Sequence, residues 1–103
     1  MGAGLPSIST TEALIMDLLR DGERFGLELV DQSGGTLKRG SVYVILARME
    51  AKGFVTSRLD DRPAPPAGAT RRLYAATGYG VQVHHAYGLL RRALALRPAT
   101  VQS

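Results

Sequence analysis

The sequence predicts a mainly α-helical domain with a small β-hairpin, followed by one further helix. Three observations lead to this prediction. Apolar residues recur at intervals of three and four in four segments, which is the spacing of one face of an α-helix. Two stretches, residues 54–59 and 71–76, instead alternate apolar and polar residues, as half-buried strands do. The eleven residues between them include three prolines and a glycine, which is typical of a loop tip.

Length and composition limit the class of protein. A chain of 103 residues fits one compact domain. The absence of cysteine excludes disulfides, thiolate catalysis and cysteine metal sites, and it fits a reducing compartment. No basic-then-apolar leader precedes the first helix, and no apolar run approaches the ~20 residues that cross a bilayer. We therefore expect a soluble, cytoplasmic protein without a membrane partner.

The net charge of +4 is distributed unevenly along the chain. Residues 1–37 hold two basic and six acidic side chains, whereas residues 38–103 hold eleven basic and three acidic ones. The two parts therefore carry net charges of −4 and +8. Because the positive charges punctuate structured segments, we expect a folded basic surface that binds an anionic partner.

The first helix is predicted to begin at Ser9. Residues 1–8 are small and irregular, and Pro6 breaks any earlier helix, so this stretch is expected to form a flexible arm. Ser9 and Glu12 have the S-x-x-E spacing of a capping box. The residues expected to face the core are Ala13, Leu14, Ile15, Leu18 and Leu19. Those expected to face water are Glu12, Asp17 and Arg20.

A second, shorter helix is predicted over residues 24–33. Its inward-facing residues are expected to be Phe25, Leu29 and Val30. Gly34 and Gly35 follow and supply a sharp turn, so that helix, turn and next helix form a helix-turn-helix pattern. Gly26 within a helix costs ~1 kcal/mol relative to alanine. We therefore expect another helix to approach closely at Gly26.

The segment from Leu37 to Val55 predicts a helix that reads DNA and then runs into a strand. Its core-facing stripe is Val42, Ile45, Leu46 and Met49, and Gly53 stands at a left-handed C-terminal cap. The opposite face combines cations, a hydroxyl, a phenol and an exposed methyl pair, which suit phosphates and base edges. The residues of this face are Arg39, Ser41, Tyr43, Val44 and Arg48. Neighbouring Lys38 is expected to contact DNA with them.

The two predicted strands, 54–59 and 71–76, form a β-hairpin that continues the basic surface. The loop between them is expected to be mobile unless DNA orders it, because its prolines cannot donate ladder hydrogen bonds. We assign Tyr74 to the core. Arg71 and Arg72 are expected to contact phosphates from the hairpin.

The last helix is predicted from Gly78 to about Arg97, with Thr77 as its cap and Pro98 at its end. Its apolar stripe consists of Val83, Tyr87, Leu90 and Leu94. Because the preceding helices and hairpin already cover one another, we expect this stripe to meet its copy in a homodimer. Twofold symmetry also matches what helix-turn-helix proteins need on palindromic sites.

Four segments follow one another in the order STTEALIMDLL, RFGLELVDQSGG, LKRGSVYVILARMEAKGFV and RRLYAATGYG. Together they resemble the short form of the PadR family of bacterial transcriptional regulators. The resemblance covers roughly residues 8–97. It implies a winged helix-turn-helix domain, which we place at residues 9–77, and a C-terminal dimerisation helix, which we place at 78–97. Residues 98–103 are expected to form a disordered tail. It further implies DNA binding as a homodimer, usually repression, and in some members a small aromatic or lipophilic effector near the dimer interface. Arg39, Gly40, Ser41 and Tyr43 match the family's DNA-facing helix start, and the arginines before Tyr74 match its wing.

An enzyme and a protein-binding module are the two alternative classes of function. An enzyme is not expected, because His84 and His85 are adjacent, point ~100° apart on a helix and cannot chelate one ion together. Asp60 and Asp61 lie in the loose loop, so we interpret them as a charge pair there, and no catalytic, cofactor or metal site is predicted. A winged-helix module that binds only proteins stays open as the alternative, since basic patches also bind acidic proteins.

Overall fold

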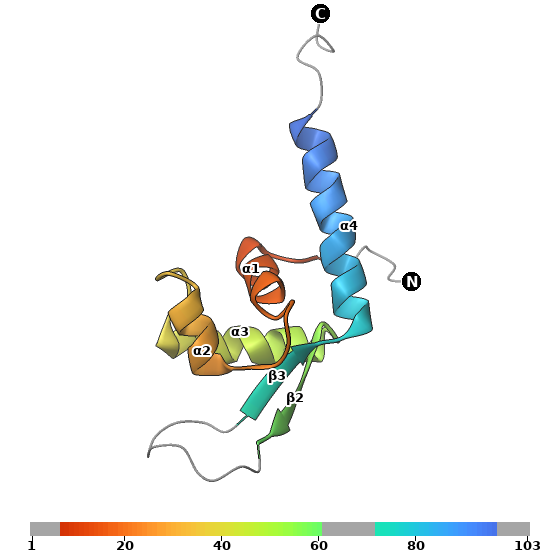
Figure 1. Cartoon of the computed structure of the whole chain (residues 1–103). Helices are drawn as coiled ribbons and strands as arrows, with labels where there is room; N and C mark the ends of the chain where they lie inside the picture. The colour runs from red at the N-terminus through yellow and green to blue at the C-terminus, as the bar shows by residue number, and fades with distance from the viewer. Residues whose placement is uncertain (1–6, 61–71, 97–103) are drawn as a thin grey trace, which may run out of the picture.

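The computed structural model describes residues 7–60 and 72–96, which hold seven helices and strands (Figure 1). In chain order they are α1 (Thr10–Leu18), β1 (Arg24–Phe25), α2 (Gly26–Gln32), α3 (Arg39–Ala51), β2 (Val55–Leu59), β3 (Arg72–Ala76) and α4 (Gly78–Ala95). The predicted mainly α-helical class with a small β-structure is confirmed. The predictions of a flexible arm, a mobile loop tip and a disordered tail fall on residues 1–6, 61–71 and 97–103, which lie outside the described residues.

The start of α1 is the predicted capping box. The Ser9 hydroxyl accepts a hydrogen bond from the Glu12 backbone N–H at 3.1 Å, and the Glu12 carboxylate accepts one from the Ser9 N–H at 2.8 Å. Glu12 does not face water, however, and that prediction is wrong: the residue is 2% exposed. Lys52, at the end of α3, reaches both carboxylate oxygens at 2.9 and 3.0 Å. The cap of α1 is thereby tied to the end of α3.

The single helix predicted over residues 24–33 is also corrected. Arg24 and Phe25 form the short strand β1, which pairs antiparallel with β3 through Arg24↔Tyr74 and Phe25↔Leu73. Helix α2 begins only at Gly26, and the Glu28 carboxylate accepts a hydrogen bond from the Phe25 N–H at 2.7 Å. The predicted hairpin is therefore part of a three-stranded sheet of order β1-β3-β2.

The long strands β2 and β3 form the predicted antiparallel pair. Their register runs from Val55↔Ala76 to Leu59↔Arg72. Tyr74 is 6% exposed, so its assignment to the core is confirmed. Burial raises the pKa of the Tyr74 phenol above its ordinary value of 10.0, because the charged form loses solvation there.

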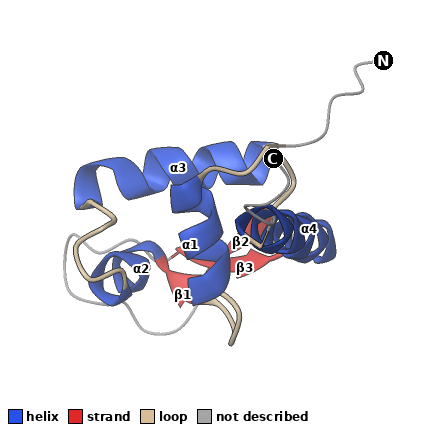
Figure 2. Ribbon diagram, turned by 90° about the horizontal axis from the view of Figure 1, so that it is seen from above, coloured by secondary structure: helices blue, strands red, loops and turns tan. Residues whose placement is uncertain are grey.

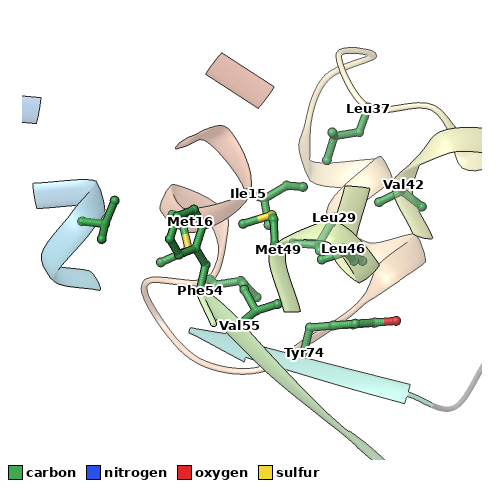
Figure 3. Packing of buried hydrophobic residues seen from close by; sticks show 12 residues of the cluster. Ile15, Met16, Leu29, Leu37, Val42, Leu46, Met49, Phe54, Val55 and Tyr74 are labelled. Atoms are coloured by element: carbon green, nitrogen blue, oxygen red, sulfur yellow. The ribbon is translucent and has the colours of Figure 1, made fainter. Parts of the chain in front are cut away.

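The core lies between the first three helices and the sheet. Figure 3 shows side chains from α1, α2, α3 and the two long strands converging on one interior. Its fully buried members include Ile15, Leu29, Val42, Leu46, Met49 and Phe54. Figure 2 shows α2 and α4 at opposite ends of the molecule, with α3 along one side. This packing fixes the inner face of α3 and leaves its outer face to solvent.

Helix α4 packs on the domain only at its start. Thr77 caps it by accepting from the Gly80 N–H at 2.9 Å, and Val83 is buried in the core cluster. The prediction that the stripe of α4 has no partner within the chain is therefore wrong for Val83, and Tyr87 is half-buried against the same cluster. Leu90 and Leu94 remain 49% and 56% exposed. The upper half of α4 rises clear of the other helices (Figure 1).

No helix within residues 7–60 and 72–96 is both long enough and apolar enough to pass through a membrane.

Candidate nucleic-acid interface

The outer face of α3 is exposed along its whole length. Val42, Leu46 and Met49 hold the opposite face in the core. Of the residues predicted to contact DNA, those exposed on or just before α3 are Lys38, Arg39, Gly40, Ser41, Val44 and Arg48. Val44 is 58% exposed, so its methyl groups face solvent. The helix thus presents a continuous surface with a methyl pair at its centre.

Small side chains line the middle of this surface. Gly40, Ser41 and Ala47 are exposed together with Val44, and a β-carbon at Gly40 meets no other atom within 4 Å. A face of small residues lets a helix approach the floor of a groove closely, and a valine methyl suits contact with a thymine methyl. Ala47 was not named by the sequence analysis, although its spacing of three from Val44 places it on the same face.

The cations of this surface are available to an external anion. Within the described part of the chain, the side chains of Lys38, Arg39 and Arg48 make no hydrogen bond or ion pair. Other cations are already engaged: Lys52 binds Glu12, and Arg58 binds Glu23 through two contacts of 2.8 Å. Lys38 and Arg39 stand at the start of α3 and Arg48 in its last turn, so unengaged cations flank its exposed surface at both ends and attract phosphate.

Tyr43 lies at the flank of the surface rather than on it. The residue is half-buried, and a β-carbon placed on Gly26 of α2 would stand 2.8 Å from its Cζ atom and 2.9 Å from its hydroxyl oxygen. The close approach predicted at Gly26 is therefore confirmed, and the approaching group is the Tyr43 ring of α3. Tyr43 fixes how α2 and α3 pack.

The sheet contributes one exposed arginine next to α3. The Arg72 guanidinium donates to the Ser57 hydroxyl oxygen at 3.1 Å, and that hydroxyl donates to the Glu50 carboxylate at 2.9 Å. Arg72 is thereby linked to the last turn of α3. No local sequence pattern predicts this link, because it joins residues from two strands and a helix. Arg71, the other predicted wing contact, lies outside the described residues.

The described residues offer no metal site: none of their histidines, aspartates and glutamates form a group of three or more that could hold an ion.

Comparison with known proteins identifies the family. The model of the transcriptional regulator PadR-like family matches residues 15–86. The chain belongs to this family. PadR-like regulators bind DNA, typically as dimers, and they are transcriptional regulators rather than enzymes.

Solved structures of PadR regulators have the same fold. A PadR family regulator from Clostridium difficile is 26% identical, with a TM-score of 0.69 over 81% of this chain and 88% of its own. A PadR family regulator from Eggerthella lenta is 22% identical, with a TM-score of 0.66 over 81% and 72%. A PadR-like regulator from Bacillus cereus is 20% identical, with a TM-score of 0.56 over 82% and 87%. No curated protein sequence matches this chain.

Proposed function

We propose that this PadR-like regulator is a repressor that binds a palindromic operator as a homodimer, with α3 of each subunit in the major groove. The observation that supports this docking most directly is the outer face of α3. It combines exposed small residues, the exposed methyls of Val44 and cations that have no partner in the described chain. An α-helix fits the major groove, and its first turn is where base contacts are made in helix-turn-helix proteins.

The wing contacts phosphates beside the same groove in this proposal. Arg72 is exposed and is held by Ser57 at 3.1 Å, so its guanidinium needs little ordering before it binds an anion. Arg71 precedes it in the chain and adds a second charge. Contacts of this kind position the protein on any DNA sequence, whereas α3 supplies the discrimination between sequences.

The exposed half of α4 joins the two subunits. Leu90 and Leu94 are about half exposed on one face of α4, where the helix extends beyond the rest of the domain. Burying these side chains against their copies stabilises a dimer by ~25 cal/mol per Å² of apolar surface removed from water. A small aromatic or lipophilic effector bound beside Tyr87 would change the angle between the subunits and release the DNA.

A gel-shift experiment at a fixed salt concentration tests the proposal, using the intergenic DNA beside the protein's own gene. Val44→Glu places a carboxylate against the phosphates and bases, so binding should weaken by more than tenfold, which corresponds to ~1.4 kcal/mol. Gln82→Glu is the matched control, because Gln82 is also exposed but lies on α4, outside its apolar stripe. Equal binding by wild type and Val44→Glu contradicts the docking. No shift with any DNA favours a module that binds proteins.

A further inference from the structure

We propose that the contact between His84 of α4 and Asp17 of α1 sets the angle at which α4 leaves the domain, and thereby the separation of the two α3 helices in the dimer. The inference rests on the homodimer proposed above. His84 is then a positioning residue, which acts on DNA recognition through the geometry of the dimer rather than by touching DNA.

The start of α4 is held tightly at one point. A β-carbon at Gly80 would stand 2.9 Å from the Phe54 Cα, so only glycine lets the helix lie this close to the start of β2. The Thr77 hydroxyl donates to the Gly53 carbonyl at 2.6 Å at the same place. Val83 and Tyr87 then pack one side of α4 against the core cluster. A second contact, on a neighbouring side of the helix, is needed to define its direction.

His84 supplies that second contact. Its Nε2 lies 2.8 Å from Asp17 Oδ1, one helical turn beyond Gly80, and the His84 side chain is 19% exposed. Asp17 also accepts from Arg20 at 3.2 Å, and the pairing with Arg20 keeps its carboxylate near the end of α1. Together with Gly80, this contact defines the line that α4 follows away from the domain.

Because there is open space beside His84, the orientation of α4 depends on the His84–Asp17 contact. A groove of about 390 Å³ and another of about 440 Å³ both run along α4, and both are lined by Arg20, Val81 and His84. The titratable and charged groups that line them are Asp17, Arg20, Glu23, His84, His85, Arg91 and Arg92. Because close packing does not fill this side of α4, tilting the helix into a groove meets little steric resistance once the His84–Asp17 contact is lost.

A small tilt at His84 has a large effect on DNA recognition. Residues Leu89 to Leu96 are exposed, so the described structure does not hold α4 beyond Gly88. From His84 to Ala95 the helix rises roughly 17 Å at about 1.5 Å per residue, so a tilt of about 10° moves its end by about 3 Å. A base-pair step is about 3.4 Å. The end of α4 thus moves by nearly one base-pair step, so a tilt of this size changes how the two α3 helices are placed relative to each other.

Pulsed electron paramagnetic resonance measures this separation without knowledge of the operator. The sequence has no cysteine, so Ala47→Cys, on the exposed face of α3, gives one spin label per subunit and one distance across the dimer. We expect a narrow distance distribution for the protein with native His84. His84→Ala should broaden the distribution or shift its centre. His84→Gln, which keeps an N–H donor near the position of Nε2, should restore it.

Two further variants complete the test. Asp17→Ala removes the same contact from α1, at a half-exposed position where the fold tolerates change, and should broaden the distribution as His84→Ala does. His85→Ala is the matched control, because His85 lines the same groove without this contact and should leave the distribution narrow. If the distribution stays narrow and centred in both His84→Ala and Asp17→Ala, the role given to the His84–Asp17 contact is overturned, whereas the proposed homodimer stands. A protein that sediments as a monomer contradicts the proposed homodimer and this inference with it.

Discussion

The aromatic ring of Tyr43 lies directly over Gly26. A β-carbon at Gly26 would stand 2.8 Å from Tyr43 Cζ, closer than packed carbon atoms approach one another. The contact joins α2 to α3 and sets the angle at which α3 presents Val44 to solvent. In the proposed docking, Tyr43 therefore acts on DNA binding through packing, in addition to any contact that its hydroxyl makes with a phosphate.

Gly26→Ala is predicted to destabilise the protein by about 1 to 3 kcal/mol, because the new methyl group overpacks the contact with Tyr43. In a Tyr43→Ala background the same substitution should be neutral or stabilising, since alanine is the better helix former. Urea denaturation of the four proteins in this double-mutant cycle measures the coupling. Gly40→Ala is the control, because its β-carbon enters open space and should not destabilise. Equal costs of Gly26→Ala in both backgrounds would show that the two residues are not coupled.

Arg39→Ala is predicted to weaken binding to the operator by about 1 to 3 kcal/mol, the value of one good bidentate base contact, and to relax the sequence preference at one position. The variant should fold normally, since Arg39 is exposed and has no partner in the described structure. Titrations with operator and with unrelated DNA separate the two effects. Arg92→Ala, which removes an exposed arginine from α4, should leave both affinities unchanged. Unchanged operator affinity in Arg39→Ala would remove this residue from the interface.

The double variant Arg71→Ala, Arg72→Ala is predicted to bind all DNA sequences more weakly. Each phosphate contact that is removed should flatten the log–log dependence of affinity on salt by about one unit, because fewer counterions are released. Arg91→Ala, Arg92→Ala is the matched control, since it removes two adjacent arginines from α4 instead of the wing. If the wing variant keeps the wild-type slope, the wing does not touch the phosphates.

Glu12→Gln is predicted to destabilise the fold at neutral pH by about 1 to 3 kcal/mol, because it leaves the half-buried Lys52 without its anion. Burial alone raises the pKa of Glu12, but hydrogen bonds from the Ser9 N–H and from Lys52, and the Lys52 charge, outweigh it, so the pKa lies below its ordinary value of 4.5. A lowered folded-state pKa stabilises the fold above the unfolded-state value, and that stability is lost as the pH falls through the folded-state pKa.

Urea denaturation at neutral and acidic pH checks this prediction. The wild type should lose stability as the pH falls below 4.5, whereas Glu12→Gln should lose less over the same range. Glu23→Gln is the control, because the Glu23–Arg58 pair is exposed and such pairs contribute at most about 1 kcal/mol. Parallel pH profiles for wild type and Glu12→Gln would contradict the role given to Glu12.

Local signals in the sequence were sufficient to predict α1, α3 and α4 and the N-terminal caps of α1 and α4. The Ser9–Glu12 capping box and the Thr77 cap each depend on residues three apart, so a short window contains all the information. The exposed face of α3 followed from helical spacing in the same way. The orientation of Glu12 was predicted wrongly because its partner, Lys52, is 40 residues away along the chain.

Contacts between distant segments account for the other differences. Strand β1 has only two residues, and its pairing with Leu73 and Tyr74 has no signal within residues 24–33. The apolar stripe of α4 was found by its spacing, but spacing does not say which partner covers it. Gly80 brings the start of α4 against Phe54 and so buries Val83 within the domain.

Leu90→Glu is predicted to convert the dimer to a monomer. The substitution would bury an unpaired carboxylate from each subunit at the interface between the two α4 helices, at a cost of several kcal/mol. The monomer should keep its fold, since Leu90 is 49% exposed within one subunit. Leu89→Glu is the matched control: Leu89 is also 49% exposed but lies about 100° around α4, so this variant should remain dimeric. Sedimentation at micromolar concentration distinguishes the two states.

We propose that two copies of this chain read one DNA site together. Sedimentation velocity with labelled intergenic DNA, titrated with wild type and with Leu90→Glu, measures how many protomers each bound duplex carries. We predict two protomers per duplex for the wild type, on half-sites about 34 Å apart, and only weak, salt-sensitive binding by Leu90→Glu. A tight wild-type complex with a single protomer, or a Leu90→Glu protein that binds as tightly as the wild type, would contradict the claim.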